Sequence, residues 1–589
     1  MKQFLFACML LIGMNACSYG QDRISSRIFG NSILNDPAYR KVSIAMSAIE
    51  QLYVDSVDRD KLAENAITGL LEKLDPHSAY LTPEEVKETN EPLQGNFDGI
   101  GIQFNMMTDT LYVIQVISGG PSEKVGILPG DKIIFVNDTL IAGVKMKNSV
   151  VMSKLKGPKG TVVRVKVLRK GAPQLLEFKI IRDKIPVYSV LASYMIDKKT
   201  GYIKIDRFAA TTYDEFKEAL AKLQKQGMEN LIMDLQDNGG GYLTAAVEIA
   251  NEFLKPGSLI VYTEGLNQKR DDARSDNSGT FRNGKLVILV NEYSASASEI
   301  VSGAIQDWDR GVLVGRRTFG KGLVQRPIPL PDGSMIRLTT ARYYTPTGRS
   351  IQKPYTKGDL ESYSKELADR YNRGEMISAD SIHFPDSLKY NTLIKKRIVY
   401  GGGGIMPDYF IPLDTASALS VASSTPLYRE IFNRGIIYKY VRTLIEANRK
   451  KYQTQYPTFE SFKNNFTVTD DMVNEMLNMY KKEKADEEKD KAAGKQPIQP
   501  DAVTVGADGA PLPQKEEAAV QLTEEQQKKD LEKSKSLILQ QIKMYVAREI
   551  YSDNEFYQLW NPLFDSYKKA IEIINDDKEY NKLLTQSKE

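Results

Sequence analysis

The sequence predicts a multidomain α+β protein, in which a layered α/β core carries an inserted β-rich module and has helical regions at both ends. Short strand-like runs separated by turn residues fill residues 95–182. Strand and helix patterns alternate over residues 200–350, while helical spacing of apolar residues dominates residues 36–90 and most of the chain after 415. The 589 residues are enough for several such units.

The composition excludes several kinds of chemistry. Lys and Arg number 79 against 76 Asp and Glu, so no global charge favours nucleic acid as a partner. The only cysteines are Cys8 and Cys17, and the only histidines are His77 and His383. No disulfide, metal or cofactor is therefore expected in the mature protein. We interpret His77, in the turn LDPHSAYLTPEE, as a structural residue, so a hydrolase built from this chain needs another base.

Residues 1–20 have the pattern of a secretory signal peptide, with Lys2 before an apolar run and small residues after it. Two cleavage sites compete. Small residues at Ser18 and Gly20 favour an ordinary cut before Gln21, whereas the residues up to Cys17 resemble a lipoprotein box that begins with an unfavourable methionine. We favour the first. In both cases the chain is expected in the periplasm or cell envelope, with a lipid anchor at Cys17 only in the second.

Residues 95–182 follow an N-terminal helical region at 21–94 and resemble a PDZ domain. The resemblance rests on GIGI at 99–102 before an apolar strand, and on GPSEKVGILPGDKIIFVND at 120–138. It implies that the backbone N–H groups of Gly99, Ile100, Gly101 and Ile102 bind the terminal carboxylate of a peptide that adds a strand to the sheet. The alternative is an ordinary glycine turn in a small β module.

The α/β pattern assigns residues 183–352 and 396–415 to one core. Its strand-like segments are GYIKIDRF, NLIMDLQ, KLVILVNEY and GVLVG, with helical segments between the first three and before the fourth. Residues 353–395 are charged and are predicted to be an irregular insertion. The remaining predicted units are a helical region at 416–484, a low-complexity linker at 485–525 and C-terminal helices at 526–589.

Two turns of the core contain candidate site residues. DLQDNGGGYL at 234–243 places three glycines between a strand and a helix. This pattern is typical of an anion-binding turn, and it is equally typical of a plain tight turn. NEYSASASEIVSGA at 291–304 places Ser294, Ser296 and Ser298 at a second strand-to-helix turn. A nucleophile is one interpretation. A helix capping box from Ser296 to Glu299 is the other, and it involves no catalysis.

Lys321 in TFGKGLVQ is the candidate base. It lies between Gly320 and Gly322, and on an extended segment it would face the same side as Gln325. A lysine must be neutral to accept a proton, and its free pKa is about 10.4. Burial in an apolar pocket lowers that pKa by up to about 3–5 units, and Ser-Lys pairs replace Ser-His-Asp in some hydrolases.

Together, SASASE at 294–299, TFGKGLVQ at 318–325, the glycine turn, GRSIQ at 348–352 and the PDZ-like module resemble the carboxyl-terminal processing proteases. The resemblance extends over roughly residues 36–415. It implies an α/β serine protease core in which the middle serine of the trio is the nucleophile, a choice that the residues alone leave open.

By this resemblance Ser296 attacks, Lys321 is the general base and Gln325 orients the lysine. The oxyanion hole is implied to be the N–H of Ala297 with a glycine amide, that of Gly240 or Gly241. One departure is Gly239, since the glycine turn of the family often has proline at that place.

The resulting expectation is an exported serine endopeptidase whose PDZ domain binds accessible C-terminal tails of protein substrates. The alternative is a catalytically silent PDZ scaffold or chaperone. An acyl-CoA type enzyme fits poorly, because an exported chain meets no CoA. The family resemblance also implies a lipoprotein adaptor or a homo-oligomer as partners of the helical ends. Finally, segments 91–98 and 183–188 are candidate hinges through which PDZ occupancy would align the core site.

Overall fold

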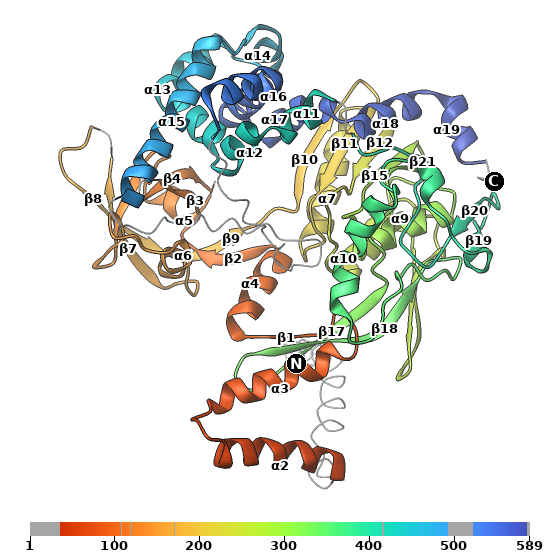
Figure 1. Cartoon of the computed structure of the whole chain (residues 1–589). Coiled ribbons are helices and arrows are strands. Elements are labelled where there is room, and N and C mark those ends of the chain that lie inside the picture. Colours follow the sequence, from red (N-terminus) through yellow and green to blue (C-terminus); the bar gives the residue numbers. More distant parts are fainter. Residues whose placement is uncertain are drawn as a thin grey trace, which may run out of the picture.

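The structure is a computed structural model that describes residues 36–492 and 522–585, except 108, 118, 170, 415 and 416. Figure 1 shows two lobes, the β-rich module and the larger core, with a helical assembly above both and a pair of helices below. The predicted signal peptide, Cys17 and most of the predicted linker lie outside the described residues. Within them, no helix is both long and apolar enough to cross a membrane.

The N-terminal region is mostly helical. Its elements are α2 (Pro37–Leu52), α3 (Arg59–Glu72), β1 (Ala79–Leu81) and α4 (Pro83–Gln94). Helix α4 begins with a capping box between Thr82 and Glu85 and ends at Gly95, which has φ +72°. No side chain of α2 is buried, whereas β1 pairs with a strand of the core, which ties this region to the protease lobe.

The β-rich module forms one antiparallel sheet in the order β3-β4-β5-β7-β8, with β6 pairing β5. The elements are β3 (Ile102–Met107), β4 (Thr110–Val116), α5 (Pro121–Lys124), β5 (Lys132–Val136), β6 (Thr139–Leu140), α6 (Asn148–Leu155), β7 (Val162–Leu168) and β8 (Leu176–Ile181). The connections to the rest of the chain, β2 (Asn96–Gly99) and β9 (Asp183–Pro186), pair with each other. The two segments predicted as hinges are thus joined in one short ribbon.

The core is built on a six-stranded sheet in the order β10-β11-β12-β15-β16-β21, parallel except for β10. Its elements are β10 (Val190–Met195), β11 (Thr200–Ile205), α7 (Thr212–Lys225), β12 (Asn230–Asp234), α8 (Leu243–Asn251), β15 (Leu286–Val290), α9 (Ala297–Asp307), β16 (Val312–Gly315) and β21 (Tyr409–Phe410). A second sheet, β1-β18-β13-β14 with β17 on β18, flanks it and comprises β13 (Leu259–Gly265), β14 (Gln268–Arg274), β17 (Leu323–Pro329) and β18 (Met335–Tyr344).

The segment 353–395 is not irregular as predicted. It contains α10 (Leu360–Asn372), the short helices η1 (Ala379–Ser381) and η2 (Asp386–Leu388), and β19 (Lys389–Asn391), which pairs with β20 (Ile398–Tyr400). Its charges hid this order from the sequence pattern, because several of them are buried in ion pairs. Arg370 of α10, for example, is almost fully buried and lies beside Glu375.

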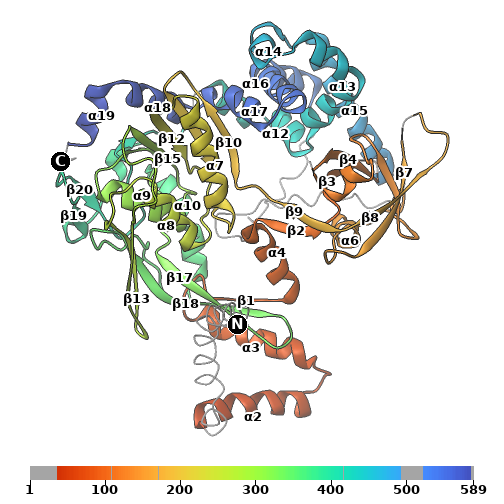
Figure 2. The same ribbon diagram turned by 180° about the vertical axis from the view of Figure 1, so that it is seen from behind.

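The chain after 416 is helical. Its helices are α11 (Ala418–Ser424), α12 (Pro426–Asn433), α13 (Ile436–Gln455), α14 (Phe459–Asn465), α15 (Asp470–Ala492), α16 (Glu524–Ile550), α17 (Asp553–Trp560), η3 (Asn561–Leu563), α18 (Asp565–Asn575) and α19 (Asp577–Leu583). Helix α15 runs into the predicted linker, so residues 485–492 are helical and not linker. Figure 2 shows α18 against the core sheet on one side and α13 beside the β-rich module on the other.

Candidate active site

Ser296 lies where β15 gives way to α9, at the N-cap of that helix. Its backbone has φ 53° and ψ −109°, a conformation that non-glycine residues rarely adopt. The N–H of Glu299 donates to the carbonyl of Ser296 (2.9 Å), and the N–H of Ser296 donates to the carboxylate of Glu299 (2.9 Å). The capping box predicted between Ser296 and Glu299 is therefore present at this helix start.

The other two serines of the trio have structural hydrogen bonds. The hydroxyl of Ser294 donates to the carbonyl of Leu235 (2.8 Å), and that of Ser298 donates to the carbonyl of Asn238 (2.9 Å). Both side chains are fully buried, whereas Ser296 is half-buried. Burial and hydrogen bonding thus distinguish Ser296 from its two neighbours.

The glycine turn at 239–241 packs directly on the serine turn. Gly240 has φ +103°, and a Cβ there would lie 2.8 Å from the Ser296 Cβ and 3.0 Å from the Ala297 nitrogen. The Gly240 N–H donates to the Asn238 side chain (2.9 Å). In the described part of the chain, no hydrogen bond from the N–H of Ala297 or of Gly241 is present. Those two amides are therefore available to bind a ligand oxygen.

Lys321 is half-buried in the loop between β16 and β17. Because β17 begins at Leu323, the pleat of the strand does not determine which side Lys321 faces, contrary to the extended segment that we expected. The flanking glycines are required for another reason. A Cβ at Gly320 would lie 3.1 Å from the Lys353 Cβ, and one at Gly322 would lie 2.9 Å from the Gln352 nitrogen, so both allow close packing against that neighbouring segment.

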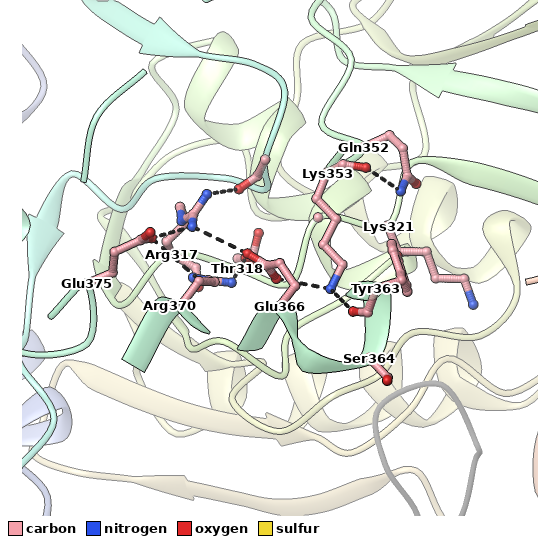
Figure 3. Close-up of polar contacts among 12 residues, drawn as sticks. Arg317, Thr318, Lys321, Gln352, Lys353, Tyr363, Ser364, Glu366, Arg370 and Glu375 are labelled. Carbon is pink, nitrogen blue, oxygen red and sulfur yellow. Dashed lines mark hydrogen bonds and ion pairs between the residues drawn. The ribbon is translucent and has the colours of Figure 1, made fainter. Parts of the chain in front are cut away.

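The segment 353–395 supports the lysine loop through buried charges (Figure 3). Arg370 of α10 donates to the carbonyls of Arg317 (2.7 Å) and Thr318 (3.0 Å), just before the loop. Lys353 pairs with Glu366 at 3.0 Å, and burial lowers its pKa. In Figure 3 the side chain of Lys321 extends away from this cluster of charges.

His77 lies in the buried turn before β1. Its N–H and that of Ser78 donate to Asp75, and its ring nitrogen contacts the hydroxyl of Tyr363 (2.8 Å). Burial, together with smaller electrostatic contributions from Lys321, Arg337 and Lys353, lowers the pKa of His77 to about 2. The imidazole is therefore neutral and occupied by structural contacts.

Gln325 lies on β17, paired with Thr339 of β18. Its amide nitrogen is buried and has no hydrogen-bond partner among the described residues. A buried donor of this kind is costly unless a ligand or a moving side chain satisfies it.

The loop predicted to bind a carboxylate connects β2 to β3. Gly99 ends β2, Ile100 is buried, Gly101 has φ +75° and Ile102 begins β3. The carbonyls of Ile100 and Gly101 accept hydrogen bonds of 3.0 Å from the N–H groups of Ser122 and Ile117, respectively. Strand β3 is the last strand at this edge of its sheet, so its outer edge is the place where a peptide strand could pair.

Three residues near the dyad were not predicted to have a site role. Glu299 was considered only as half of a capping box, yet it also accepts hydrogen bonds from the lysine loop. Thr318 and Tyr343 contact the same region. No local pattern could have revealed these contacts, because they join segments separated by 19 to 47 positions.

Three models of known families match the site-bearing regions. Residues 199–362 match peptidase family S41, residues 99–180 match the PDZ domain, and residues 18–85 match the N-terminal domain of the activating protease CtpB. Residues 427–498 match a family of unknown function. The matched models define a serine-type peptidase that carries a PDZ domain.

Two named proteins are similar to this chain over more than 300 residues each. The chain is 38% identical over 308 residues to a carboxy-terminal-processing protease of Bartonella bacilliformis, covering 51% of this chain and 69% of the relative. It is 34% identical over 364 residues to the carboxy-terminal processing protease CtpA of Bacillus subtilis, covering 61% and 75%. The chain thus belongs to the carboxy-terminal processing protease family. A solved photosystem II D1 C-terminal processing protease is 30% identical, with a TM-score of 0.30, over 52% of this chain and 88% of that one.

Proposed function

We propose that this chain is an exported endopeptidase of the cell envelope that cleaves protein substrates with accessible C-terminal tails, using Ser296 as nucleophile and Lys321 as general base. The observation that carries the proposal is the difference within the serine trio. Ser294 and Ser298 donate their hydroxyls to main-chain carbonyls, while Ser296 is half-buried, strained and beside the glycine turn. Backbone strain of this kind is often retained at catalytic sites.

The reaction would proceed through an acyl-enzyme. Neutral Lys321 accepts the proton of the Ser296 hydroxyl as its Oγ attacks the carbonyl carbon of the scissile bond. The N–H groups of Ala297 and Gly241 stabilise the oxyanion; Gly240 is less suited, because its N–H already donates to Asn238. The Lys321 ammonium then protonates the leaving amine, and a water activated by Lys321 releases the acyl group from Ser296.

Gln325 would orient Lys321 through its side-chain amide. Its buried nitrogen without a described partner supports such a role, because a neighbouring polar side chain that moves during the reaction could satisfy it.

The PDZ domain would bind the substrate before cleavage. The terminal carboxylate would lie at the loop formed by Gly99, Ile100, Gly101 and Ile102, with the tail pairing along β3. The paired hinge segments β2 and β9 support a further part of the proposal, that tail binding shifts the PDZ domain and aligns the core site. Export would follow from the signal sequence at 1–20, with cleavage before Gln21 favoured over lipidation at Cys17.

A decisive experiment compares three purified proteins on an unfolded substrate with an apolar C-terminus. Ser296→Ala and Lys321→Ala should each lower kcat/KM by at least about a thousandfold, while Ser294→Ala, which lacks the proposed role, should retain activity if it folds. Wild-type rates in either dyad variant would reject the mechanism. A wild-type protein that cleaves no tested substrate above background would favour the second candidate, a catalytically silent PDZ scaffold or chaperone.

Deleting residues 95–182 tests the role of the PDZ domain. Cleavage of tailed substrates should fall while a short unstructured peptide is still cleaved at a measurable rate. Unchanged rates on tailed substrates would reject tail capture by this domain.

A further inference from the structure

Glu299 of α9 is fully buried, with 0% of its surface exposed, and it joins the two loops of the site. Its Oε2 accepts the N–H groups of Ser296 (2.9 Å) and of Lys321 (2.9 Å). Its Oε1 accepts the N–H of Gly320 (2.8 Å) and the hydroxyl of Thr318 (2.5 Å). Because one oxygen atom binds both, the amide nitrogens of Ser296 and Lys321 lie no farther apart than twice the length of one hydrogen bond.

Tyr343 of β18 joins the same two residues through their other main-chain group. Its side chain is 1% exposed, and its hydroxyl lies within hydrogen-bonding distance of the carbonyl oxygens of Ser296 (3.1 Å) and Lys321. The hydroxyl carries one proton, so it donates to one carbonyl at a time or shares the proton between both. Glu299 therefore accepts both N–H groups, and Tyr343 donates to the two carbonyls.

We propose that Glu299 and Tyr343 are positioning residues that fix the main chain of Ser296 and of Lys321 at one separation, so that the hydroxyl and the amine meet in the geometry that proton transfer requires. The proposal rests on the proposed Ser-Lys mechanism. Its physical basis is that proton transfer needs the two heavy atoms within hydrogen-bond reach, and that a misplacement of about 1 Å can lower a rate about a hundredfold.

The chemistry of Glu299 argues against a role in packing alone. An apolar side chain would fill the same space without burying a charge, and a buried carboxylate is unfavourable unless donors surround it. Here all four donors come from the two site loops and none from a remote element. The ionised carboxylate can accept from all four, whereas a protonated carboxyl or an amide would turn one oxygen site into a donor.

Two variants that each remove one hydroxyl test the proposal with little change in volume. Tyr343→Phe removes the contact with the carbonyls. Thr318→Val removes one donor from Glu299, and it also removes the acceptor of the Ile405 N–H (2.6 Å), which Thr318→Ser restores. Each should lower kcat by between about 10-fold and 100-fold, with KM within about twofold of wild type, because the substrate contacts themselves are unchanged. Tyr344→Phe is the matched control, since Tyr344 is the next residue and its ring stacks on Tyr262 at 4.8 Å. Thr318→Ser, which restores the hydroxyl, should recover most of the activity lost in Thr318→Val.

A second readout separates positioning from simple loss of folded protein. Reaction of Ser296 with a fluorophosphonate probe is measured from pH 5 to pH 10 on folded protein. The titratable side chains that interact with Glu299 from neighbouring elements are Tyr343 on β18 and Lys353 after β18. Thr318→Val leaves the Glu299 carboxylate with one hydrogen-bond donor fewer, which disfavours its ionised form. Because the ionised form is the one that accepts hydrogen bonds from both loops, the pH of half-maximal labelling of Ser296 should be higher in Thr318→Val than in wild type and in Thr318→Ser.

Wild-type kcat and an unshifted labelling midpoint in both Tyr343→Phe and Thr318→Val would overturn the proposal. If only Tyr343→Phe is impaired, the part concerning Glu299 is wrong. Failure of the underlying mechanism is distinguishable, because Ser296→Ala and Lys321→Ala would then retain activity as well. Glu299→Gln gives a further comparison, but the two hydroxyl variants keep the test valid if that variant does not fold.

Discussion

The central sheet of the protease core has two apolar faces, and helices from very different parts of the chain cover them. The crossover face is covered by α7, α8 and α9, which lie between successive strands in the sequence. The C-terminal face is covered by α18 and α19, which begin 155 and 167 positions after the end of β21 in a chain of 589 residues. Alternate residues of one strand serve both, since Leu231 and Met233 of β12 join the first cluster and Ile232 joins the second.

The two faces of the sheet also differ in which of them adjoins the candidate site. The serine and glycine turns, which contain proposed site residues, follow the carboxyl ends of β15 and β12 and lead into α9 and α8 of the crossover face. The C-terminal face carries none of the proposed site residues, yet it is closed by Tyr567, Ile573, Ile574 and Tyr580. The last helices are therefore part of the protease core. The same region also reaches the PDZ domain, through Arg442 of α13, which donates to the carbonyl of Ile114 (2.9 Å).

Deleting residues 553–589 should have the largest effect. The four large side chains that close this face would be lost. Each contributes about 1.5–3 kcal/mol when fully buried, together about 6–12 kcal/mol. That is comparable to the entire stability of a typical domain. We expect insoluble protein or no cooperative thermal unfolding by circular dichroism. Deleting residues 37–52 is the control, because α2 has no buried side chain. A soluble, cooperatively folding 1–552 chain would show that the two faces are not equivalent in stability.

One buried isoleucine from each face of the sheet allows the stability contributions of the two faces to be compared. Ile573 and Ile249 are both fully buried, in α18 and α8 respectively. Truncation of either to alanine should destabilise the protein by about 2–5 kcal/mol, measured by urea unfolding. If Ile573→Ala costs less than about 1 kcal/mol while Ile249→Ala costs its full amount, the C-terminal helices are only loosely attached.

The buried carboxylate of the crossover face predicts a pH dependence of stability. Burial raises the pKa of Glu299 from 4.5 to about 7. The folded state then binds more protons than the unfolded state between these values, so stability is greatest below pH 4.5 for this group and falls as the pH rises through about 7. The loss amounts to about 3 kcal/mol. The slope of unfolding free energy over this range should be smaller in Glu299→Gln, and an equal slope in both proteins would contradict the prediction.

The contact between α13 and the PDZ domain should have the smallest effect. Arg442→Ala removes the Arg442 donor from the partly buried carbonyl of Ile114, while the carbonyl of Val113 still accepts the N–H of Gly130 (2.8 Å). The loss costs about 1–3 kcal/mol. Differential scanning calorimetry should show the PDZ domain unfolding at a lower temperature than in wild type. Lys450→Ala on the same helix, where the side chain is exposed, should leave the transition unchanged. Equal transitions in the two variants would mean that α13 does not fix the PDZ domain.

Local sequence patterns predict the α/β alternation of the core, the β-rich module and the short segments that contain the candidate site residues. These depend on local periodicity and on glycine, serine and lysine at close spacing, which act over a few residues. The sequence could not show that residues 353–395 are ordered, because the buried ion pairs of Arg370 and Glu375 look like ordinary surface charges. Nor could it choose among three serines without the family resemblance.

The contacts that these segments make with distant parts of the chain are visible only in the folded structure. The hydroxyls of Ser294 and Ser298 are distinguished from that of Ser296 by carbonyls about 60 positions away, at Leu235 and Asn238. The second face of the sheet is closed by helices at the far end of the chain. Such contacts form between segments that are far apart in the sequence, because apolar faces and buried polar groups must be satisfied in the folded structure. Local amino-acid patterns do not indicate which distant segment will be the partner.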